Sequence, residues 1–158
     1  MEIILAENHG FCYGVKRAVE MANEAADSDG KSYTLGPIIH NPQVVGRLES
    51  KGVRPIQEVA DIDEGTMIIR SHGVGPAIYE EAEEKGLNIL DATCPHVKKA
   101  QQDAKSVIED GMTLVILGEK NHPEVKSINL WANNKGIIIE DEESAKNLQV
   151  DRKSTRLN

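Results

Sequence analysis

The chain has 158 residues, enough for one ordinary domain or two small ones, and its one Trp, one Phe and three Tyr predict a core built from aliphatic side chains. A net charge of −8 argues against nucleic acid and anionic membrane surfaces as partners. No apolar run approaches the roughly 18 residues of a membrane span, and the opening MEIILAENHG lacks the basic region of a signal peptide, so we expect a cytoplasmic protein with reduced thiols.

Short β-branched runs alternate with helical patterns along the chain. We expect strands at residues 2–6, 32–36, 66–70, 87–91, 113–118 and 136–140. We expect helices at 14–27, from Pro42, from Pro76, from Pro95, from near Pro123 and at 142–148, because apolar residues recur there at helical spacing and proline is favoured at the first helical position. Repeated βα units of this kind predict an α/β fold around a mainly parallel sheet.

The stretch DATCPH places a thiol at a helix start. Pro95 is expected at the first helical position, which makes Cys94 the N-cap. The positive end of the helix dipole favours the thiolate form of a sulfur at that position. Cys94 is therefore a candidate metal ligand or nucleophile.

Cysteine and histidine residues follow five of the predicted strands. In chain order the loops carry Cys12, His40, His72, Cys94, and then His122 with Glu124. Taken singly, a histidine in such a loop is more often a hydrogen-bonding loop residue, and a cysteine a small apolar residue. Because chemistry in parallel sheets gathers at the carboxyl ends of the strands, the joint pattern predicts that these six residues converge on one site.

Two thiols and three imidazoles fit more than one kind of site. A zinc site normally shows closely spaced pairs such as C-x-x-C, which this chain lacks. A Cys–His hydrolase would leave one cysteine and two histidines without a role. An iron–sulfur site takes thiolates from distant segments and leaves the imidazoles free for an anionic substrate.

Five ordered motifs resemble one known family. GFCYGVKRA, GPIIHNPQVV, IRSHGVGP, DATCPHV and NHPEV, in this order and spacing, resemble the 4-hydroxy-3-methylbut-2-enyl diphosphate reductases, and the resemblance covers essentially all of residues 1–150. The resemblance implies an iron–sulfur oxidoreductase that catalyses the last step of the non-mevalonate isoprenoid pathway. Its products are isopentenyl and dimethylallyl diphosphate, and ferredoxin or flavodoxin is the electron donor.

The same resemblance implies the roles of the site residues. Cys12 and Cys94 match two of three cysteine ligands of a [4Fe–4S] cluster. His40, His72 and His122 match the histidines that hold the substrate diphosphate, and Glu124 matches the acid that delivers a proton to the substrate hydroxyl.

The resemblance also implies a division of the chain. The family folds as three similar α/β domains around the cluster, so we expect residues 1–12 to be an opening strand and cluster loop of the third domain, 13–95 the first domain and 96–150 an incomplete second domain. The tail DRKSTRLN, 151–158, has three basic residues, one acid and no periodicity, and we interpret it as foreign sequence. Because the third cysteine is absent, we expect an inactive N-terminal fragment.

Overall fold

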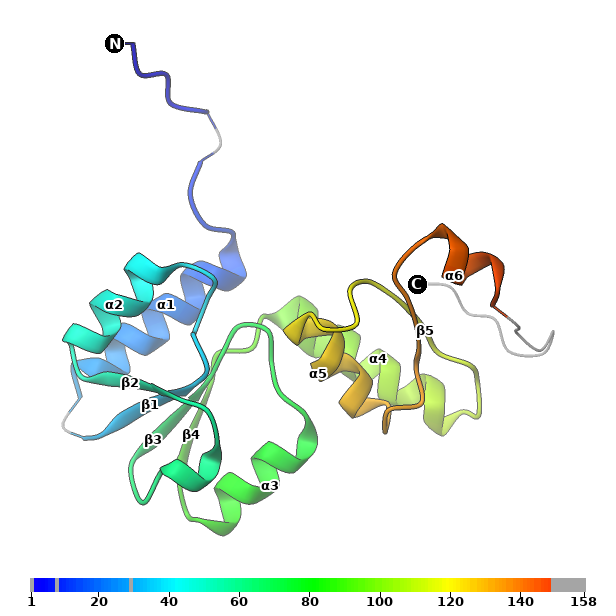
Figure 1. Cartoon of the computed structure of the whole chain (residues 1–158). Helices are drawn as coiled ribbons and strands as arrows, with labels where there is room; N and C mark the ends of the chain where they lie inside the picture. The colour runs from blue at the N-terminus through cyan, green and yellow to red at the C-terminus, as the bar shows by residue number, and fades with distance from the viewer. Residues whose placement is uncertain (1, 8, 29, 149–158) are drawn as a thin grey trace.

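A four-stranded parallel sheet forms the centre of the first of two α/β units (Figure 1). The structure is a computed structural model and describes residues 2–7, 9–28 and 30–148. The elements of the first unit are α1 (Tyr13–Ala26), β1 (Ser32–Leu35), α2 (Pro42–Ser50), β2 (Val53–Ile56), the 3-10 helix η1 (Val59–Asp61), β3 (Thr66–Ile69), α3 (Pro76–Glu84) and β4 (Asn88–Asp91). The strand order is β2-β1-β3-β4, and every neighbouring pair is parallel.

The second unit is smaller and lies beside the first (Figure 1). It contains α4 (Pro95–Glu109), β5 (Val115–Leu117), α5 (Pro123–Trp131), β6 (Ile137–Ile139) and α6 (Glu142–Lys146). Strands β5 and β6 form a parallel two-stranded sheet. The predicted α/β class with repeated βα units is confirmed.

Each face of the four-stranded sheet has its own hydrophobic cluster. Successive strand residues point to opposite faces, so Ile68 joins the cluster under α1 and α2 while Ile69 joins the one under η1 and α3. The first cluster contains Ala18, Ala22, Ala25, Ile38, Ile39, Val44, Leu48, Val53, Ile68 and Ala92, and the second contains Leu35, Val59, Ile62, Met67, Ile69, Val74, Ala82 and Leu87. Ile68 and Ile69 are both 0% exposed, and burial of such a side chain contributes about 1.5–3 kcal/mol.

Proline sets the start of four helices, as the sequence predicted. α2, α3, α4 and α5 each begin with proline. Cys94 is the N-cap of α4, which confirms its predicted position, and Cys12 is the N-cap of α1. At α2 the Asn41 side chain accepts a 3.0 Å hydrogen bond from the backbone N–H of Val44, which satisfies one of the free donors of the first helical turn.

Strand β2 was not among the predicted strands. Its sequence VRPI contains Pro55, which cannot donate a backbone hydrogen bond, and such a residue weakens a strand prediction. The structure accommodates Pro55 because β2 lies at the edge of the sheet and pairs only with β1.

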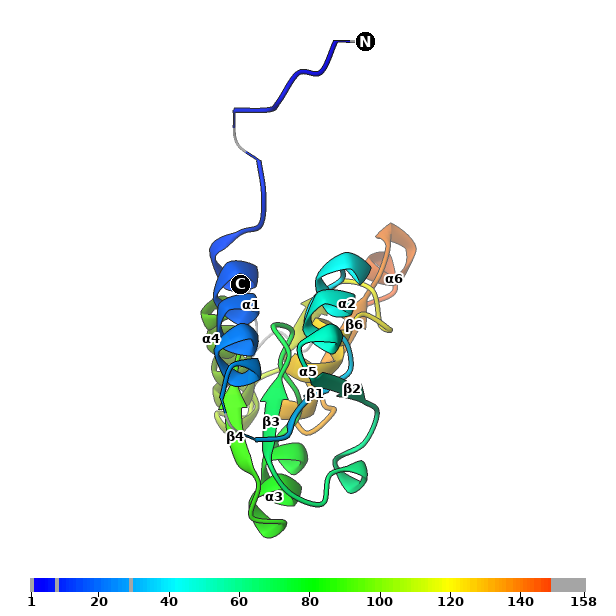
Figure 2. The same cartoon turned by 90° about the vertical axis from the view of Figure 1, so that its left-hand side faces the viewer.

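The strand predicted at residues 2–6 is wrong. These residues form no regular element, and Ile3, Ile4 and Leu5 are 74%, 83% and 77% exposed. The segment runs away from both units (Figure 2), so no sheet edge is available to pair with it. Cys12 consequently precedes α1 without following a strand.

Two further observations concern the chain as a whole. Among the described residues, no helix combines the length and the apolar character needed to cross a membrane. The tail predicted to be foreign, 151–158, lies outside the described residues.

Candidate functional site

The loops after β1 and β3 leave the sheet in opposite directions. β1 continues through α2 to β2 on one side, whereas β3 continues through α3 to β4 on the other. Because α2 and α3 cover opposite faces, the carboxyl ends of β1 and β3 form a topological switch point, where open α/β sheets bind ligands. His40 and His72 follow these two strands.

Hydrogen bonds hold three loops together beyond the strand ends. The N–H of Ser71 donates to the carbonyl of Ile38 over 3.3 Å, and the N–H of Cys94 donates to the carbonyl of Ser71 over 2.9 Å. These bonds continue the order β1-β3-β4 past the sheet. The loops that carry His40, His72 and Cys94 therefore lie side by side.

The three predicted histidines come together at this edge. The ring centroids of His40 and His72 lie 4.5 Å apart, those of His72 and His122 5.7 Å, and those of His40 and His122 6.1 Å. His40 and His72 come from the first unit, and His122 is the N-cap of α5 in the second. The predicted convergence of these histidines from separate loops is thus present in the structure.

The histidines differ in their surroundings. His122 Nδ1 accepts a 3.2 Å hydrogen bond from the backbone N–H of Glu124. Since that nitrogen acts as the acceptor, Nε2 carries the hydrogen of the neutral ring. Burial, reinforced by the positive charges of His40, Arg70 and His122, lowers the pKa of His72 to about 4.

Glu124 lies in the first turn of α5, two residues after His122. Its carboxylate makes no ion pair and no side-chain hydrogen bond with the other described residues. A carboxyl group without such a partner is chemically suited to proton transfer.

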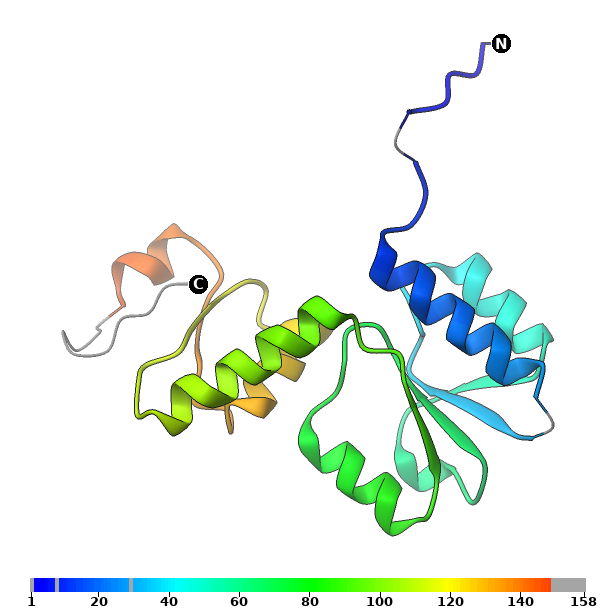
Figure 3. The same cartoon turned by 180° about the vertical axis from the view of Figure 1, so that it is seen from behind.

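The two cysteines lie at neighbouring helix starts. The N-terminal ends of α1 and α4 are adjacent, as seen from behind in Figure 3. A Cβ atom added at Gly14, in the first turn of α1, would lie 2.6 Å from Cys94 Sγ. Only glycine leaves room for the sulfur there, so the second residue after Cys12 lies directly against Cys94. Both cysteines are free thiols.

The donor set is incomplete for a metal within this chain. Among residues 2–7, 9–28 and 30–148, no group of three or more His, Cys, Asp or Glu side chains is arranged to hold a metal ion. Two thiol sulfurs at adjacent helix starts nevertheless suit the thiolate ligation that iron–sulfur clusters require. They fit such a group as two members of a ligand set.

The loop that carries His72 is held by α5 through contacts that the sequence did not predict. Ser127 Oγ donates to the carbonyl of His72 over 2.8 Å, and Trp131 Nε1 donates to the carbonyl of Val74 over 2.9 Å. Gln101 of α4 in turn donates to Ser127 Oγ over 3.3 Å. The only signal in the sequence is that Ser127 and Trp131 are four residues apart, on one face of a helix.

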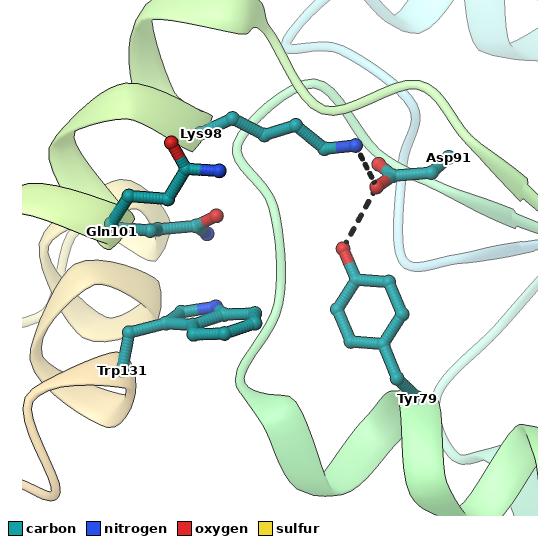
Figure 4. Close-up of a pocket in the computed structure, with 6 residues that line it drawn as sticks. Tyr79, Asp91, Lys98, Gln101 and Trp131 are labelled. Carbon is teal, nitrogen blue, oxygen red and sulfur yellow. Dashed lines mark hydrogen bonds and ion pairs between the residues drawn. The ribbon is translucent and has the colours of Figure 1, made fainter. Parts of the chain in front are cut away.

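Asp91 stabilises the turn that precedes Cys94. It also lines a cavity of about 210 Å³ between the two units (Figure 4). Its carboxylate lies 2.6 Å from Lys98 Nζ, and it accepts hydrogen bonds from the Tyr79 hydroxyl at 3.0 Å and the Thr93 N–H at 2.9 Å. Burial acts to raise the pKa of Asp91, but the hydrogen bonds from Lys98 and Thr93 together hold it below its usual value. Asp91 thus fixes the turn that leads from β4 into α4.

Arg17 secures the same turn from α1. Its guanidinium donates to the carbonyls of Thr93, at 3.2 Å, and of Asp91, at 3.3 Å. Cys12 is the N-cap of α1, and this turn ends at Cys94, the N-cap of α4. Arg17 therefore links the helix that follows one cysteine to the turn that precedes the other.

Comparison with known proteins adds a family relationship. The model of a family described as LytB protein matches residues 3–157. Among curated relatives, the 4-hydroxy-3-methylbut-2-enyl diphosphate reductase of Geotalea uraniireducens is 52% identical over 139 residues, 88% of this chain and 49% of the relative. The protein of the same name from Geobacter metallireducens is 51% identical over 148 residues, 94% of this chain and 52% of the relative. The chain therefore spans about half the length of the curated relatives it matches.

Two solved structures share the fold. A structure of (E)-4-hydroxy-3-methyl-but-2-enyl diphosphate reductase, described as the terminal enzyme of the non-mevalonate pathway, matches with a TM-score of 0.78 at 47% identity and covers 92% of this chain and 53% of that one. The E-1-hydroxy-2-methyl-but-2-enyl-4-diphosphate reductase from Plasmodium falciparum matches with a TM-score of 0.88 at 31% identity and covers 94% of this chain and 47% of that one.

Proposed function

Because this chain belongs to the LytB protein family, we propose that it forms part of an iron–sulfur oxidoreductase that acts on 4-hydroxy-3-methylbut-2-enyl diphosphate. In this reaction the allylic C–O bond breaks and the oxygen leaves as water. Two electrons and two protons are consumed, one proton going to the oxygen and one to the allylic carbon framework. The products are isopentenyl and dimethylallyl diphosphate.

The observation that carries this proposal is the cluster of His40, His72 and His122, whose ring centroids lie no more than 6.1 Å apart. Imidazole N–H groups donate hydrogen bonds to phosphoryl oxygens, and a protonated ring adds positive charge. A bound diphosphate would bring negative charge beside His72, which favours protonation of that ring and so strengthens its hydrogen bond. We assign the three histidines to the diphosphate.

Cys12 and Cys94 are assigned to the cofactor. They would supply two thiolate ligands of a [4Fe–4S] cluster, with Arg17 and Asp91 holding their supporting turns. When bound, such a cluster supplies the electron-transfer chemistry of the reaction.

Glu124 is assigned as the proton donor. A hydroxide ion is a poor leaving group, whereas water leaves readily, so an acid beside the substrate hydroxyl lowers the barrier to C–O cleavage. Glu124 adjoins His122 through the backbone and lacks an ion-pair partner among the described residues, so its carboxyl group is available for that task.

The remaining features of the proposal follow from the family relationship. Ferredoxin or flavodoxin would deliver the electrons, and the reaction would take place in the cytoplasm. The division into an opening segment of the third domain at 1–12, a first domain at 13–95, an incomplete second domain at 96–150 and a foreign tail at 151–158 also remains a proposal. On this division the 158-residue chain by itself is an inactive fragment.

The test compares this chain with a version extended by the remaining half of a relative. Both proteins are reconstituted anaerobically with iron and sulfide, and iron content and reductase rate are measured with reduced ferredoxin. The extended protein is expected to hold a stable cluster and turn over, whereas the 158-residue chain retains little iron. An extended protein that holds iron yet leaves the allylic diphosphate unchanged would contradict the proposed reaction.

Variants of the extended protein test the residue roles. Glu124→Gln should retain cluster and substrate binding but lose roughly 100-fold or more in turnover, because general acid catalysis typically contributes a factor of that order. Glu143→Gln, a neutralisation on exposed α6, is the matched control and should leave turnover unchanged. Equal rates for the two variants would remove Glu124 from the reaction.

A further inference from the structure

A second cavity lies between the carboxyl end of the first unit's sheet and helix α5. Its volume is about 270 Å³. The lining residues of the first unit include Gly36, Gln57 and Arg70, and those of the second include Lys126 and Leu130. None of the three clustered histidines lines it, although Gly73 and Pro123, which follow His72 and His122 in the chain, do; the cavity therefore adjoins the histidine cluster but is lined by other side chains.

Two cations without a counter-ion face this cavity. Arg70 and Lys126 make no ion pair and no side-chain hydrogen bond with other described residues. Arg70 Nε is buried and lacks a hydrogen-bond partner. No aspartate or glutamate is among the lining residues. The cavity is therefore lined by two cations and no carboxylate, in a protein whose net charge is −8.

Gly36 leaves room for the Arg70 guanidinium at the cavity wall. Its backbone has φ +72, a conformation that favours glycine, and an added Cβ would lie 3.0 Å from Arg70 Nη1. The absence of a side chain lets the guanidinium lie close over the end of β1. A side chain at position 36 would displace the guanidinium from this part of the cavity wall.

A partly buried guanidinium without a partner is costly, because desolvation of a charge is offset only by pairing or hydrogen bonding. Burial lowers the pKa of Arg70, yet arginine remains protonated at any physiological pH. An anion in the cavity would supply the missing partner for Arg70 Nε and for Lys126. The planar guanidinium matches phosphoryl oxygens in a two-pronged arrangement, and two cations favour a ligand with more than one negative charge.

We propose that Arg70 and Lys126 form a second anion site, which binds the phosphate or diphosphate group of a small molecule independently of the three histidines. The turn from Arg70 to Gly73, closed by a 3.0 Å hydrogen bond from the Gly73 N–H to the Arg70 carbonyl, separates the two sites. This inference does not rest on the proposed reductase activity.

Calorimetry on the 158-residue chain tests the proposal with inorganic phosphate, inorganic pyrophosphate and an alkyl diphosphate as probes. Pyrophosphate is expected to bind at two sites. Arg70→Gln and Lys126→Gln should each weaken one site roughly 10- to 100-fold, the usual range for loss of a hydrogen bond to a charged group. Tight binding of phosphate itself would identify the free ion as a sufficient ligand, and preference for the alkyl diphosphate would identify an organic molecule.

Matched variants separate this site from the histidines and from bulk charge. Lys135→Gln removes one exposed cation outside the cavity and should change neither site. His122→Asn, which keeps a good N-cap, should weaken only the other site, and Arg70→Lys should bind the anion at intermediate strength. Lys126 is exposed, so its variant should fold normally even if Arg70→Gln does not.

Three results would overturn the proposal. One is a single pyrophosphate site that His122→Asn abolishes and both cation variants leave intact; the histidine assignment would then stand alone. Another is equal weakening of pyrophosphate binding by Lys135→Gln and Lys126→Gln, which would show that binding depends on the net charge of the chain and not on this cavity. The third is the absence of any phosphate, pyrophosphate or alkyl diphosphate binding. Conversely, a site lost in Arg70→Gln and kept in His122→Asn would support this inference even if the histidine site failed.

Discussion

Two buried nitrogen atoms in one turn lack a hydrogen-bond partner among the described residues: Arg70 Nε and His72 Nδ1. Buried polar atoms are nearly always hydrogen-bonded, because leaving one unpaired costs about 1–3 kcal/mol. Both atoms belong to the segment that follows β3 at the topological switch point. An exception of this kind at such a position agrees with the two anion sites proposed above, whose ligands would complete the hydrogen bonding.

The low pKa of His72 predicts a specific loss of stability in acid. Its pKa lies near 4 in the folded protein, against an ordinary value of 6.5, so the unfolded chain takes up the proton first as the pH falls. The free energy of unfolding should therefore decrease between pH 6.5 and pH 4. After allowance for partial exposure, we expect this histidine to account for about 1–2 kcal/mol.

Urea unfolding of the wild type and His72→Gln across this pH range measures that contribution. Carboxylates titrate in both proteins, so the difference between their curves isolates the histidine. His96→Gln, at an exposed position, serves as the control. Parallel pH curves for wild type and His72→Gln would show that the ring is not held in its neutral form.

Ser127 connects the candidate site to the second unit. It is 2% exposed, its single hydroxyl hydrogen lies within reach of the carbonyls of His72 and Glu124, with Oγ 2.8 and 2.9 Å from their oxygens, and it accepts from Gln101. Ser127→Ala would leave these buried groups unpaired and should cost about 1–3 kcal/mol in urea unfolding. Ser50→Ala removes a serine hydroxyl at an exposed position and should change stability by no more than about 0.5 kcal/mol. Similar costs for both would mean that the Ser127 contacts contribute nothing specific.

At the scale of elements, helix N-termini carry most of the candidate site. Cys12, Cys94 and His122 are N-caps of α1, α4 and α5, and His40 precedes the Asn41 cap of α2. Helix starts present free N–H groups and a partial positive charge, which suits thiolates and oxyanions. The recurrent proline at the first helical position fixes where each helix begins, and so where each functional side chain lies.

Two glycines in helices predict opposite effects of the same substitution. Gly46 in α2 has no atom within 4 Å of an added Cβ, so Gly46→Ala should stabilise the protein by about 0.5–1 kcal/mol through helix propensity. Gly14→Ala in α1 places a Cβ 2.6 Å from Cys94 Sγ and should destabilise it by about 1–3 kcal/mol.

Urea unfolding of both variants checks these signs, and the alkylation rate of Cys94 reports whether its sulfur moves. Gly46→Ala is the matched control for Gly14→Ala, since it makes the same change in a helix at a position with open space. Stabilisation by both substitutions would show that α1 and Cys94 are not in close contact.

At the scale of the whole molecule, the two units share an order of elements but differ in completeness. A helix capped by cysteine, a strand, a helix opened by proline and a second parallel strand occur in each. In the first unit two further strands complete the sheet, whereas the described part of the second has only β5 and β6. Leu117 of β5 and Ile137 of β6 remain 81% and 38% exposed, and a two-stranded sheet is marginally stable by itself.

This difference predicts unequal local stability. Amide hydrogens of β5 and β6 should exchange at least about tenfold faster than those of β1 and β3, which lie inside the four-stranded sheet. Hydrogen exchange followed by mass spectrometry measures both regions in one sample. Equal protection would mean that the two units open together, with the contacts of Ser127 and Trp131 strong enough to couple them.

The site was more predictable than the strands. Helix starts followed from proline positions, and the meeting of His40 and His72 followed from the shared edge of parallel strands. His122 joins them from the separate sheet of β5 and β6, so its approach depends on the packing of the two units. Strand β2 was missed because Pro55 weakens its local signal, and the strand at 2–6 was wrong because its apolar pattern lacks a partner. That all six predicted residues line one pocket stays a prediction.

By itself the sequence determined which segments form the six described α-helices, where four of them begin, and that His40, His72, Cys94 and His122 follow strands, since these depend on neighbours within a few residues. Only the tertiary structure decided which apolar segments find a sheet edge and which side chains meet across the units. Trp131 reaches the carbonyl of Val74, and Arg70 faces the same cavity as Lys126, although each pair is more than fifty positions apart. No periodicity encodes such contacts, because they arise only when packing of both units brings distant backbone and side chains together.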